Sequence, residues 1–462
     1  MVSISGIRGI IGESLTPDIV VKYSAAFAQY CKRGKIIIGR DGRVSGKIIG
    51  NIVSSTLLSM GCDVVALGVV PTPTIALAVE KLGATGGIAI TASHNPIQWN
   101  GMKFIGSSGL FLNAEENKHF WSIADTGLFK YAVWNKIGKH NADETFYLKH
   151  IEAVLNQSII DVEQIRQCKF KVVIDCINAA GGMIVPHLLR NLGCEVIEMN
   201  CDVSGIFSRT PEPVPENLAE LCNRVHETKA DLGIAVDPDV DRLVLINENG
   251  EPFGEEYTIT SVVKFILEKY KHISKPTTAI HKTSAVNIQP SVVVNLSTTR
   301  AVEDVAKLYH ANVFRTPVGE INVAMRMKEI GAVVGGEGSG GVILPAVHYG
   351  RDAIVGIAVI LQQLAEFGGT LSEFKKTLPQ YSISKSKIDI SGKNPEQIFE
   401  KIRQNNSSLG TINSDDGLKI DFSDSWIHLR KSNTEPIIRI IAEAPTMEQA
   451  DEIVNQFKNQ IG

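Results

Sequence analysis

Short apolar runs alternate along the chain with longer segments in which apolar residues recur at helical spacing. Residues 35–43 (KIIIGRDGR) form such a run, and 44–61 follow with helical spacing and end in Gly61, a residue suited to close a helix. The alternation restarts at 169–182 and again after residue 249. Three successive units of this kind predict α/β domains with mixed or parallel sheets.

The pattern changes after about residue 370. Strands are predicted at 381–391, at 418–432 and at 436–445, and helices at 394–406 and 446–460. Thr446 is a suitable N-cap for the last helix, with Gln449 three residues further as its capping-box partner. A smaller α+β domain therefore closes the chain.

Composition places the chain among globular proteins. Hydrophobic residues make up 44% of its 462 residues and charged residues 21%, a profile typical of an α/β enzyme. The net charge is -4, from 46 basic and 50 acidic residues without a dense Lys/Arg block, which argues against a nucleic-acid partner. Any anionic ligand has to be held by local cations.

Cysteine usage and the apolar runs bear on location. The seven cysteines include no CxxC pair, which fits reduced, packed thiols in a reducing compartment rather than a disulfide or zinc framework. No apolar run reaches the roughly 18 residues that span a bilayer, and the first residues lack the pattern of a signal peptide. We expect a cytoplasmic protein without a membrane partner.

A polar cluster, TASHNP at 91–96, follows the strand-like run GGIAI. Asn, Ser and Pro together are common in turns, so the cluster is either a plain turn or a loop that presents Ser93 for chemistry. On the second interpretation Ser93 lies on an exposed loop, and its substitution by alanine keeps the fold while abolishing turnover.

A second cluster, DPDVDR, follows another predicted strand that ends at residue 236. Asp237, Asp239 and Asp241 lie two residues apart and project to one side of an extended segment, where a cation such as Mg²⁺ would relieve their repulsion. A solvated acidic turn is an alternative, and so is a calcium loop, with Glu248 at its twelfth position. The calcium loop is disfavoured because Arg242 stands where such a loop needs glycine and a strand-like run follows.

Two further loops offer polar groups between apolar runs. VVGGEGSGGVIL (333–344) carries Glu337 and Ser339, and is either a hairpin-like turn or a loop whose carboxylate accepts hydrogen bonds from sugar hydroxyls. RKSNTEP (430–436) is either an ordinary polar loop or a phosphate cradle of Arg430, Ser432, Asn433 and Thr434. One mechanism uses all four clusters: a phosphorylated serine beside Mg²⁺ is an activated phosphoryl donor.

These four motifs, in this order and at these separations, resemble those of the α-D-phosphohexomutases. SGIRG (5–9), NGMKF (100–104) and TPVGE (316–320) extend the resemblance over essentially the whole chain. It implies four domains around a central cleft, three similar α/β domains with mixed sheets and a smaller C-terminal α+β domain. With the loops named above, the domains become 1–150 with the phosphoserine loop, 151–248 with the metal loop, 249–370 with the sugar loop and 371–462 with the phosphate loop.

The resemblance also implies an activity and a set of site residues. Phosphate moves between C1 and C6 of a hexose through phospho-Ser93 and a hexose 1,6-bisphosphate, which serves as activator and intermediate. The metal ligands implied for Mg²⁺ are Ser93, Asp237, Asp239 and Asp241. The catalytic residues implied besides Ser93 are Arg8, His94, Lys103 and Arg242, with Lys103 a candidate general acid or base. The substrate-binding residues implied are Thr316, Glu337, Ser339, Arg430, Ser432, Asn433 and Thr434.

One position departs from the family pattern. Many relatives continue the sugar loop with Gly-His, whereas Gly340 is followed here by Gly341, and His348 is a candidate replacement. The form of the loop most resembles phosphoglucosamine mutases, which convert glucosamine 6-phosphate to glucosamine 1-phosphate, and a broad phosphoglucomutase/phosphomannomutase is the alternative. More distant alternatives are an aspartyl-phosphate-type phosphatase and a non-catalytic sugar-phosphate sensor. The expected partner is a small phosphosugar, bound by a monomer or a homodimer.

Overall fold

The computed structural model describes residues 2–3, 6–273, 289–406, 409–432 and 436–461. The chain divides into two compact units, one of Met1–Thr258 with Ser339–Lys375 and one of Ile259–Gly338 with Lys376–Gly462. Within the described ranges, no helix has both the length and the apolar character that crossing a membrane requires.

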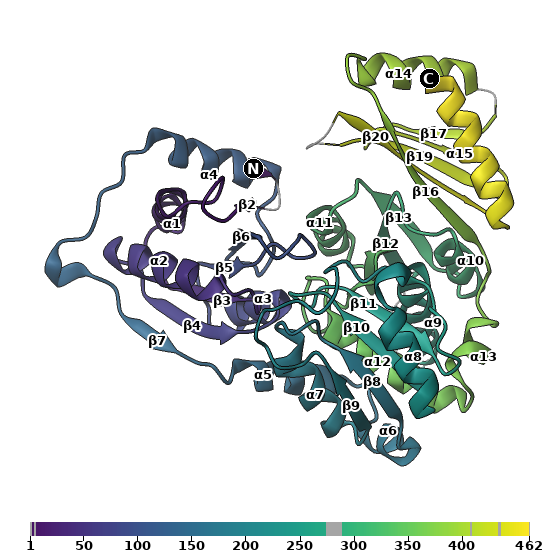
Figure 1. Cartoon of the computed structure of the whole chain (residues 1–462), viewed down its shortest axis with the longest axis horizontal. Helices are drawn as coiled ribbons and strands as arrows, with labels where there is room; N and C mark the ends of the chain where they lie inside the picture. The colour runs from purple at the N-terminus through teal and green to yellow at the C-terminus, as the bar shows by residue number, and fades with distance from the viewer. Residues whose placement is uncertain (1, 4–5, 274–288, 407–408, 433–435, 462) are drawn as a thin grey trace, which may run out of the picture. The chain divides into compact units, whose positions relative to one another are not determined.

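The first sheet has seven strands in the order β1-β2-β6-β5-β3-β4-β7 (Figure 1). Its strands are β1 (Val2–Ser3), β2 (Gly6–Ile10), β3 (Ile36–Arg40), β4 (Val64–Val69), β5 (Gly86–Ile90), β6 (Trp99–Gly106) and β7 (His140–Ala142). The strands β5, β3, β4 and β7 are parallel and the remaining pairings are antiparallel, so the sheet is mixed, as predicted.

Helices cover both faces of this sheet, so its central strands are buried on both sides. They are α1 (Pro17–Tyr30), α2 (Gly46–Ser59), α3 (Thr72–Lys81), α4 (Ala114–Thr126) and α5 (Phe146–Leu155). In β3, Ile36 and Ile38 join the core that α1, α2 and α4 cover, whereas Ile37 joins the core that α3 and α5 cover. As predicted, α2 is followed by Gly61 in a positive-φ conformation.

The second sheet has the order β11-β10-β8-β9, with β11 antiparallel to β10 and the other pairs parallel. Its strands are β8 (Lys171–Asp175), β9 (Glu195–Met199), β10 (Leu232–Val236) and β11 (Leu243–Asn247), with helices α6 (Val162–Cys168), α7 (Gly181–Asn191) and α8 (Ala219–Thr228). The DPDVDR cluster is thus the turn of a β-hairpin. This strand–turn–strand arrangement is not that of a calcium loop, which leads into a helix.

The third sheet has the order β13-β12-β14-β15, and its strands β13, β12 and β14 are parallel. These strands are β12 (Ser291–Asn295), β13 (Asn312–Thr316), β14 (Val334–Glu337) and β15 (Gly341–Ile343), the last at the start of the segment that returns to the first unit. The helices of this part of the chain are α9 (Glu255–Ile273), α10 (Ala301–Leu308), α11 (Glu320–Ile330), α12 (Ala353–Phe367) and α13 (Leu371–Lys375).

The fourth sheet is antiparallel, in the order β16-β20-β19-β18-β17. It consists of β16 (Ser382–Asp389), β17 (Thr411–Asn413), β18 (Leu418–Asp421), β19 (Trp426–Lys431) and β20 (Ile437–Ala444), packed against α14 (Pro395–Asn406) and α15 (Met447–Ile461) (Figure 1). The single strand predicted at 418–432 was wrong, because a turn closed by Phe422 and Ser425 divides it into β18 and β19. The Thr446 cap is confirmed, since its hydroxyl accepts from the Gln449 N–H.

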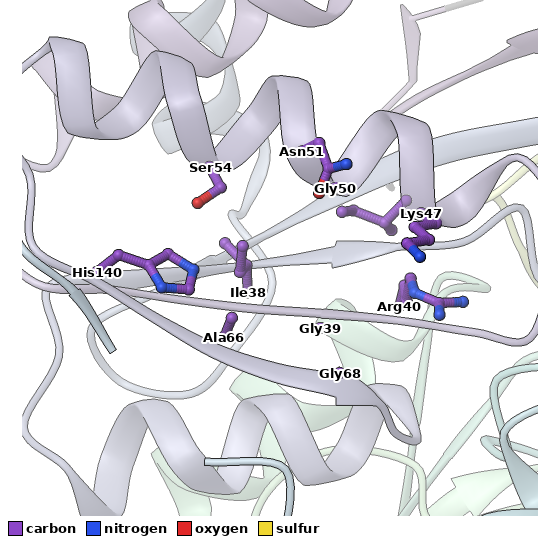
Figure 2. A pocket seen from close by; sticks show the side chains of 11 residues that line it. Ile38, Gly39, Arg40, Lys47, Gly50, Asn51, Ser54, Ala66, Gly68 and His140 are labelled. Carbon is purple, nitrogen blue, oxygen red and sulfur yellow. The ribbon is translucent and has the colours of Figure 1, made fainter. Parts of the chain in front are cut away.

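A hollow of about 150 Å³ lies between α2 and the strands β3 and β4 (Figure 2). Its floor is apolar, with Ile38 and Ala66, and Arg40 and Lys47 lie at one end. None of the site residues predicted from the sequence lines it. The predicted site residues Ser93 and Asp237 lie instead in loops that follow the strands β5 and β10.

Candidate active site

Ser93 lies in the loop that follows β5. Its backbone adopts the left-handed region, with φ of 48°, which is uncommon for a residue other than glycine. Its N–H donates to Thr91 Oγ1 at 2.8 Å. The expectation of an exposed hydroxyl was wrong, since only 2% of the residue is exposed. The loop therefore holds the serine inward, in a conformation that the surrounding structure has to maintain.

Arg43 supplies much of that support. Its guanidinium donates to four backbone carbonyl oxygens of the loop and its flank, those of Ser93 (2.6 Å), Asn95 (2.6 Å), Pro96 (2.7 Å) and Trp99 (2.9 Å). The sequence analysis did not single out this residue. The available signal was an arginine in the polar segment directly after β3, at the same sheet edge as the serine loop.

The charge of Arg43 is balanced by a buried acid. Asp41 Oδ2 accepts from Arg43 Nε at 3.1 Å and from the Thr91 hydroxyl at 2.7 Å. Burial raises the pKa of Asp41, although the charge of Arg43 opposes this. Since Thr91 also accepts from the Ser93 N–H, one connected network links the strand end to the serine.

The three aspartates lie together beside Ser93. The Ser93 hydroxyl donates to Asp237 Oδ2 at 3.0 Å, and carboxylate oxygens of Asp237, Asp239 and Asp241 lie within 4.8 Å of one another. The hairpin turn that holds them places Val240 at a φ of 62°, which is unusual for a β-branched side chain. All three aspartates are at most 1% exposed.

Protein donors also hold the second oxygen of Asp237 and one oxygen of Asp239. Asp237 Oδ1 accepts from the backbone N–H groups of Asp241 (3.1 Å) and Arg242 (3.2 Å). Asp239 Oδ2 accepts from the Thr72 hydroxyl at 2.7 Å, at the start of α3, and from Lys103 Nζ at 2.6 Å.

Asp241 is likewise held by protein donors at one carboxylate oxygen. Its Oδ2 accepts from Arg351 Nη2 at 2.6 Å and from Lys103 Nζ at 3.4 Å. The Oδ1 atoms of Asp239 and Asp241 are buried and have no hydrogen-bond partner among the described residues. Buried carboxylate oxygens without donors are costly unless a cation is present, so this donor set fits a hard divalent metal ion.

The acid–base properties of the cluster support the same conclusion. Burial, followed by the charges of Asp241 and Asp239, raises the pKa of Asp237 well above its usual range. Burial would also raise the pKa of Asp239 and of Asp241, but nearby cations outweigh it and lower both. For Asp239 the main cation is Lys103, and for Asp241 it is Arg351. Lys103 and Arg351 therefore stabilise the charged forms of Asp239 and Asp241, whereas the carboxyl of Asp237 faces like charges that a bound cation would offset.

Four other residues predicted for the reaction centre lie near this cluster. Lys103 bridges two of the aspartates, as described, and Arg242 Nε lies 3.9 Å from Asp241 Oδ1. Arg8 donates to the Asn95 side chain at 3.0 Å, and His94 Nδ1 lies 3.3 Å from the Ser93 hydroxyl oxygen. Burial, and then the charges of Arg242 and Arg8, lower the pKa of His94 to about 3, so this imidazole is neutral at physiological pH.

In the second unit, Glu337 ends β14 and is 4% exposed. Its Oε1 accepts from Asn295 Nδ2 at 2.8 Å and from the Gly319 N–H at 3.0 Å. Asn295 ends the neighbouring strand β12 and was not recognised from the sequence, although a polar residue at a strand end was a usable signal. Ser339, from the same loop as Glu337, is half-buried and belongs to the first unit.

The phosphate loop of the second unit is tied to the same region. Arg430 Nε lies 2.8 Å from Asp416 Oδ2, which also accepts from the Val318 N–H at 2.9 Å, next to the Gly319 that binds Glu337. Segment 316–320 thus connects the sugar loop to the phosphate loop. Thr316 and Ser432 are 6% and 8% exposed. Asn433 and Thr434 lie outside the described residues.

His348 does not take the place of the histidine absent at Gly341. Its Nε2 lies 3.0 Å from Asp352 Oδ2, and its Nδ1 accepts from the Gly350 N–H at 2.9 Å. His150 Nε2 contacts the same carboxylate oxygen at 2.7 Å. Both ring nitrogens of His348 are engaged in a buried network, so the suggestion that it assists proton transfer was wrong.

Comparison with protein-family models matches the chain four times in succession. Their descriptions are phosphoglucomutase/phosphomannomutase, alpha/beta/alpha domain I (residues 2–130), domain II (146–250), domain III (277–381) and C-terminal domain (388–460). The four-domain architecture predicted from the sequence is thus confirmed.

Individual proteins resemble the chain over its whole length. A probable phosphoglucosamine mutase of Methanopyrus kandleri is 35% identical and covers 98% of this chain and 96% of its own. A phosphoglucomutase/phosphomannomutase of Thermococcus kodakarensis is 37% identical and covers 97% and 95%. The crystal structure of a phosphoglucomutase/phosphomannomutase family protein from Burkholderia thailandensis shares the fold, with a TM-score of 0.84, 23% identity and coverage of 100% and 98%.

Proposed function

Because the chain belongs to the phosphoglucomutase/phosphomannomutase family, we propose that it transfers phosphate between the C1 and C6 oxygens of a hexose through phospho-Ser93. It is an isomerase of the intramolecular phosphotransferase class. The observation that carries the proposal is the Ser93 hydroxyl, 3.0 Å from Asp237, in the same acidic cluster as two buried carboxylate oxygens that accept no hydrogen bond from the described residues.

The three aspartates, with an oxygen of phospho-Ser93, would hold Mg²⁺. The ion would withdraw charge from the transferring phosphoryl group. Asp239 and Asp241 are oriented by hydrogen bonds from Thr72, Lys103 and Arg351. Asp237 is oriented by backbone N–H groups of the turn. Asp237 Oδ2 already faces the serine oxygen to which the phosphoryl group is bound.

Each half-reaction exchanges one P–O bond for another. In the first, the bond between phosphorus and Ser93 Oγ breaks and Oγ takes up a proton, while the sugar hydroxyl oxygen bonds to phosphorus and loses its proton, for which Lys103 in its neutral form is the candidate acceptor. The product is a hexose 1,6-bisphosphate. In the second, Ser93 Oγ loses its proton and attacks the other phosphoryl group, and the released sugar oxygen takes up a proton, for which protonated Lys103 is the candidate donor. Arg8 and Arg242 would contact the phosphoryl oxygens. The neutral imidazole of His94 would contact the hydroxyl oxygen of Ser93.

The sugar and phosphate loops would supply substrate recognition. Glu337, whose orientation Asn295 and the Gly319 N–H fix, would accept hydrogen bonds from sugar hydroxyls together with Ser339 and Thr316. Arg430, Ser432, Asn433 and Thr434 would bind the phosphate that does not react. The proposed substrate is glucosamine 6-phosphate, and the Methanopyrus relative, named a probable phosphoglucosamine mutase, supports this choice. Because the relative from Thermococcus kodakarensis is named phosphoglucomutase/phosphomannomutase, a broad enzyme of that kind is the second candidate. We also propose the domain limits 1–150, 151–248, 249–370 and 371–462, and a monomer or homodimer.

The experiment is a comparison of kcat/KM for glucosamine 6-phosphate, glucose 1-phosphate and mannose 1-phosphate, with Mg²⁺ and a trace of hexose 1,6-bisphosphate. A preference of a hundredfold for the amino sugar, about 2.7 kcal/mol of transition-state binding, supports the phosphoglucosamine mutase. Comparable values for glucose and mannose support the broad enzyme. Free phosphate without isomerised sugar would indicate a phosphatase, and absence of any turnover a sensor.

A further inference from the structure

Gly341 begins β15 at the position where the family resemblance leads one to expect histidine. A Cβ atom built on Gly341 would lie 2.4 Å from Cδ and 3.1 Å from Cγ of Arg351. The φ of Gly341 is not among the positive values of the chain, so its backbone does not exclude a side chain. A side chain at position 341 is instead disfavoured by the aliphatic stem of Arg351, which fills the space beside the glycine.

The guanidinium at the end of that stem reaches the acidic cluster. Arg351 Nη2 lies 2.6 Å from Asp241 Oδ2, and the two side chains are 11% and 1% exposed. A carboxylate with one oxygen held by a planar donor has restricted rotation. As a result the orientation of Asp241 is fixed, and its Oδ1 is left without a hydrogen-bond partner among the described residues, with Arg242 Nε 3.9 Å away.

We propose that Arg351 is a positioning residue of the phosphoryl-transfer centre, and that position 341 is glycine so that the arginine stem can pass. Arg351 acts through Asp241, as hydrogen-bond partners of metal ligands do, and Gly341 sets the path of its side chain. The inference rests on the proposed function, since it takes the three aspartates as ligands of a divalent cation.

The test measures Mn²⁺ binding directly, from the electron paramagnetic resonance signal of the free ion, in wild type, Arg351→Met, Arg351→Ala, Gly341→Ala and the double variant Gly341→Ala/Arg351→Ala. Loss of the arginine is expected to weaken Mn²⁺ binding by about 10–100-fold. Gly341→Ala is expected to weaken it as well, because the new methyl group displaces Arg351. The double variant is expected to match Arg351→Ala within about twofold, since no stem remains to be displaced.

Unchanged or tighter Mn²⁺ binding in both arginine variants would overturn the proposal, because the arginine would then be a bystander or a repelling charge. Additive losses in the double variant would overturn the role of Gly341. Arg166→Ala, at an exposed arginine, and Gly50→Ala, where the new Cβ meets only Ile90 at 3.6 Å, are the matched controls. Melting midpoints near that of wild type exclude a loss of fold. Because the readout needs no turnover, failure of the mutase assay in wild type is a separate result that bears on the proposed function.

Discussion

The Nη2 atom of Arg43 lies 2.6 Å from the carbonyl oxygen of Ser93 and donates a hydrogen bond to it. The same guanidinium binds three further carbonyls and is paired with Asp41, and neither side chain of this pair is exposed. A backbone that reaches a positive φ at a residue other than glycine is retained only when its surroundings determine it. The buried arginine is the main such determinant for the serine loop.

We therefore expect Arg43→Met to destabilise the protein and to slow phosphorylation of Ser93. Removal of one partner of a buried ion pair costs about 3–5 kcal/mol, which corresponds to a melting midpoint lower by roughly 6–20 °C. Differential scanning fluorimetry measures the first effect and intact-mass analysis of phosphate incorporation the second. Arg33→Met removes an exposed arginine and is the control. Equal melting midpoints and labelling rates for the two variants would contradict the assignment.

Ser93→Ala is expected to keep the fold and lose all measurable mutase turnover. Although the hydroxyl is buried, it donates a single hydrogen bond, to the Asp237 carboxylate, so its loss costs about 1–3 kcal/mol. Ser93→Thr tests the backbone as well, because a β-branched residue is disfavoured at φ of 48° and should reduce turnover while retaining a hydroxyl. Turnover and melting midpoint are measured on both variants. Substantial turnover in Ser93→Ala would rule out the phosphoserine mechanism.

The sequence predicted those parts of the site whose residues follow strands. Ser93 comes directly after β5 and Asp237 directly after β10, so an apolar run followed by polar residues located both. The spacing of the aspartates also indicated a shared face. The burial of Ser93 was missed because it depends on carbonyl contacts to Arg43, a residue 50 positions earlier in the chain.

Side-chain packing and short turns, which the pattern of polar and apolar residues does not reveal, explain the other omissions. The relation of Arg351 to Gly341 is steric and arises only when β15 and the segment before α12 are packed together. His348 was suggested because it is near in sequence, yet its ring nitrogens are engaged by Asp352 and Gly350. The division of 418–432 into two strands was missed because the apolar alternation outweighed the short polar turn between them.

Asn295→Asp is expected to weaken substrate binding. The amide of Asn295 donates to Glu337 at 2.8 Å, and an isosteric carboxylate would replace this donor by a like charge next to a buried acid. A loss of about 1.4 kcal/mol or more of substrate-binding free energy would raise KM at least about tenfold. The fall in kcat would be smaller if Glu337 binds the ground state and the transition state alike. Asn312→Asp, at the exposed start of β13, is the control. Unaltered kinetics in Asn295→Asp would remove Glu337 from the proposed sugar site.

His428 is expected to make the second unit less stable in mild acid. This buried imidazole lies 2.9 Å from the Ser297 hydroxyl and 2.7 Å from the Asp416 carbonyl oxygen. Burial is the main cause that lowers the pKa of His428 to about 4; the charges of Arg430 and Lys419 act in the same direction, and the hydrogen bond and charge of Asp416 act against them. An unfolded histidine titrates near pH 6.5, so between about pH 6.5 and 4 the unfolded chain binds a proton that the folded chain does not.

The sign of the effect follows from this difference in proton binding. Where the unfolded state binds more protons, stability rises with pH, so the contribution of His428 is present above about pH 6.5 and is lost as the pH falls toward 4. His428→Gln keeps a group that can donate to Asp416 but does not titrate. We expect it to flatten the pH dependence of the urea midpoint between about pH 4.5 and 7. The control, His119→Gln on the surface helix α4, should leave that dependence unchanged. Urea titrations followed by tryptophan fluorescence suit this measurement because Trp426 is buried in the same strand, β19. A slope in His428→Gln equal to that of wild type would show that acid destabilises the second unit through other groups.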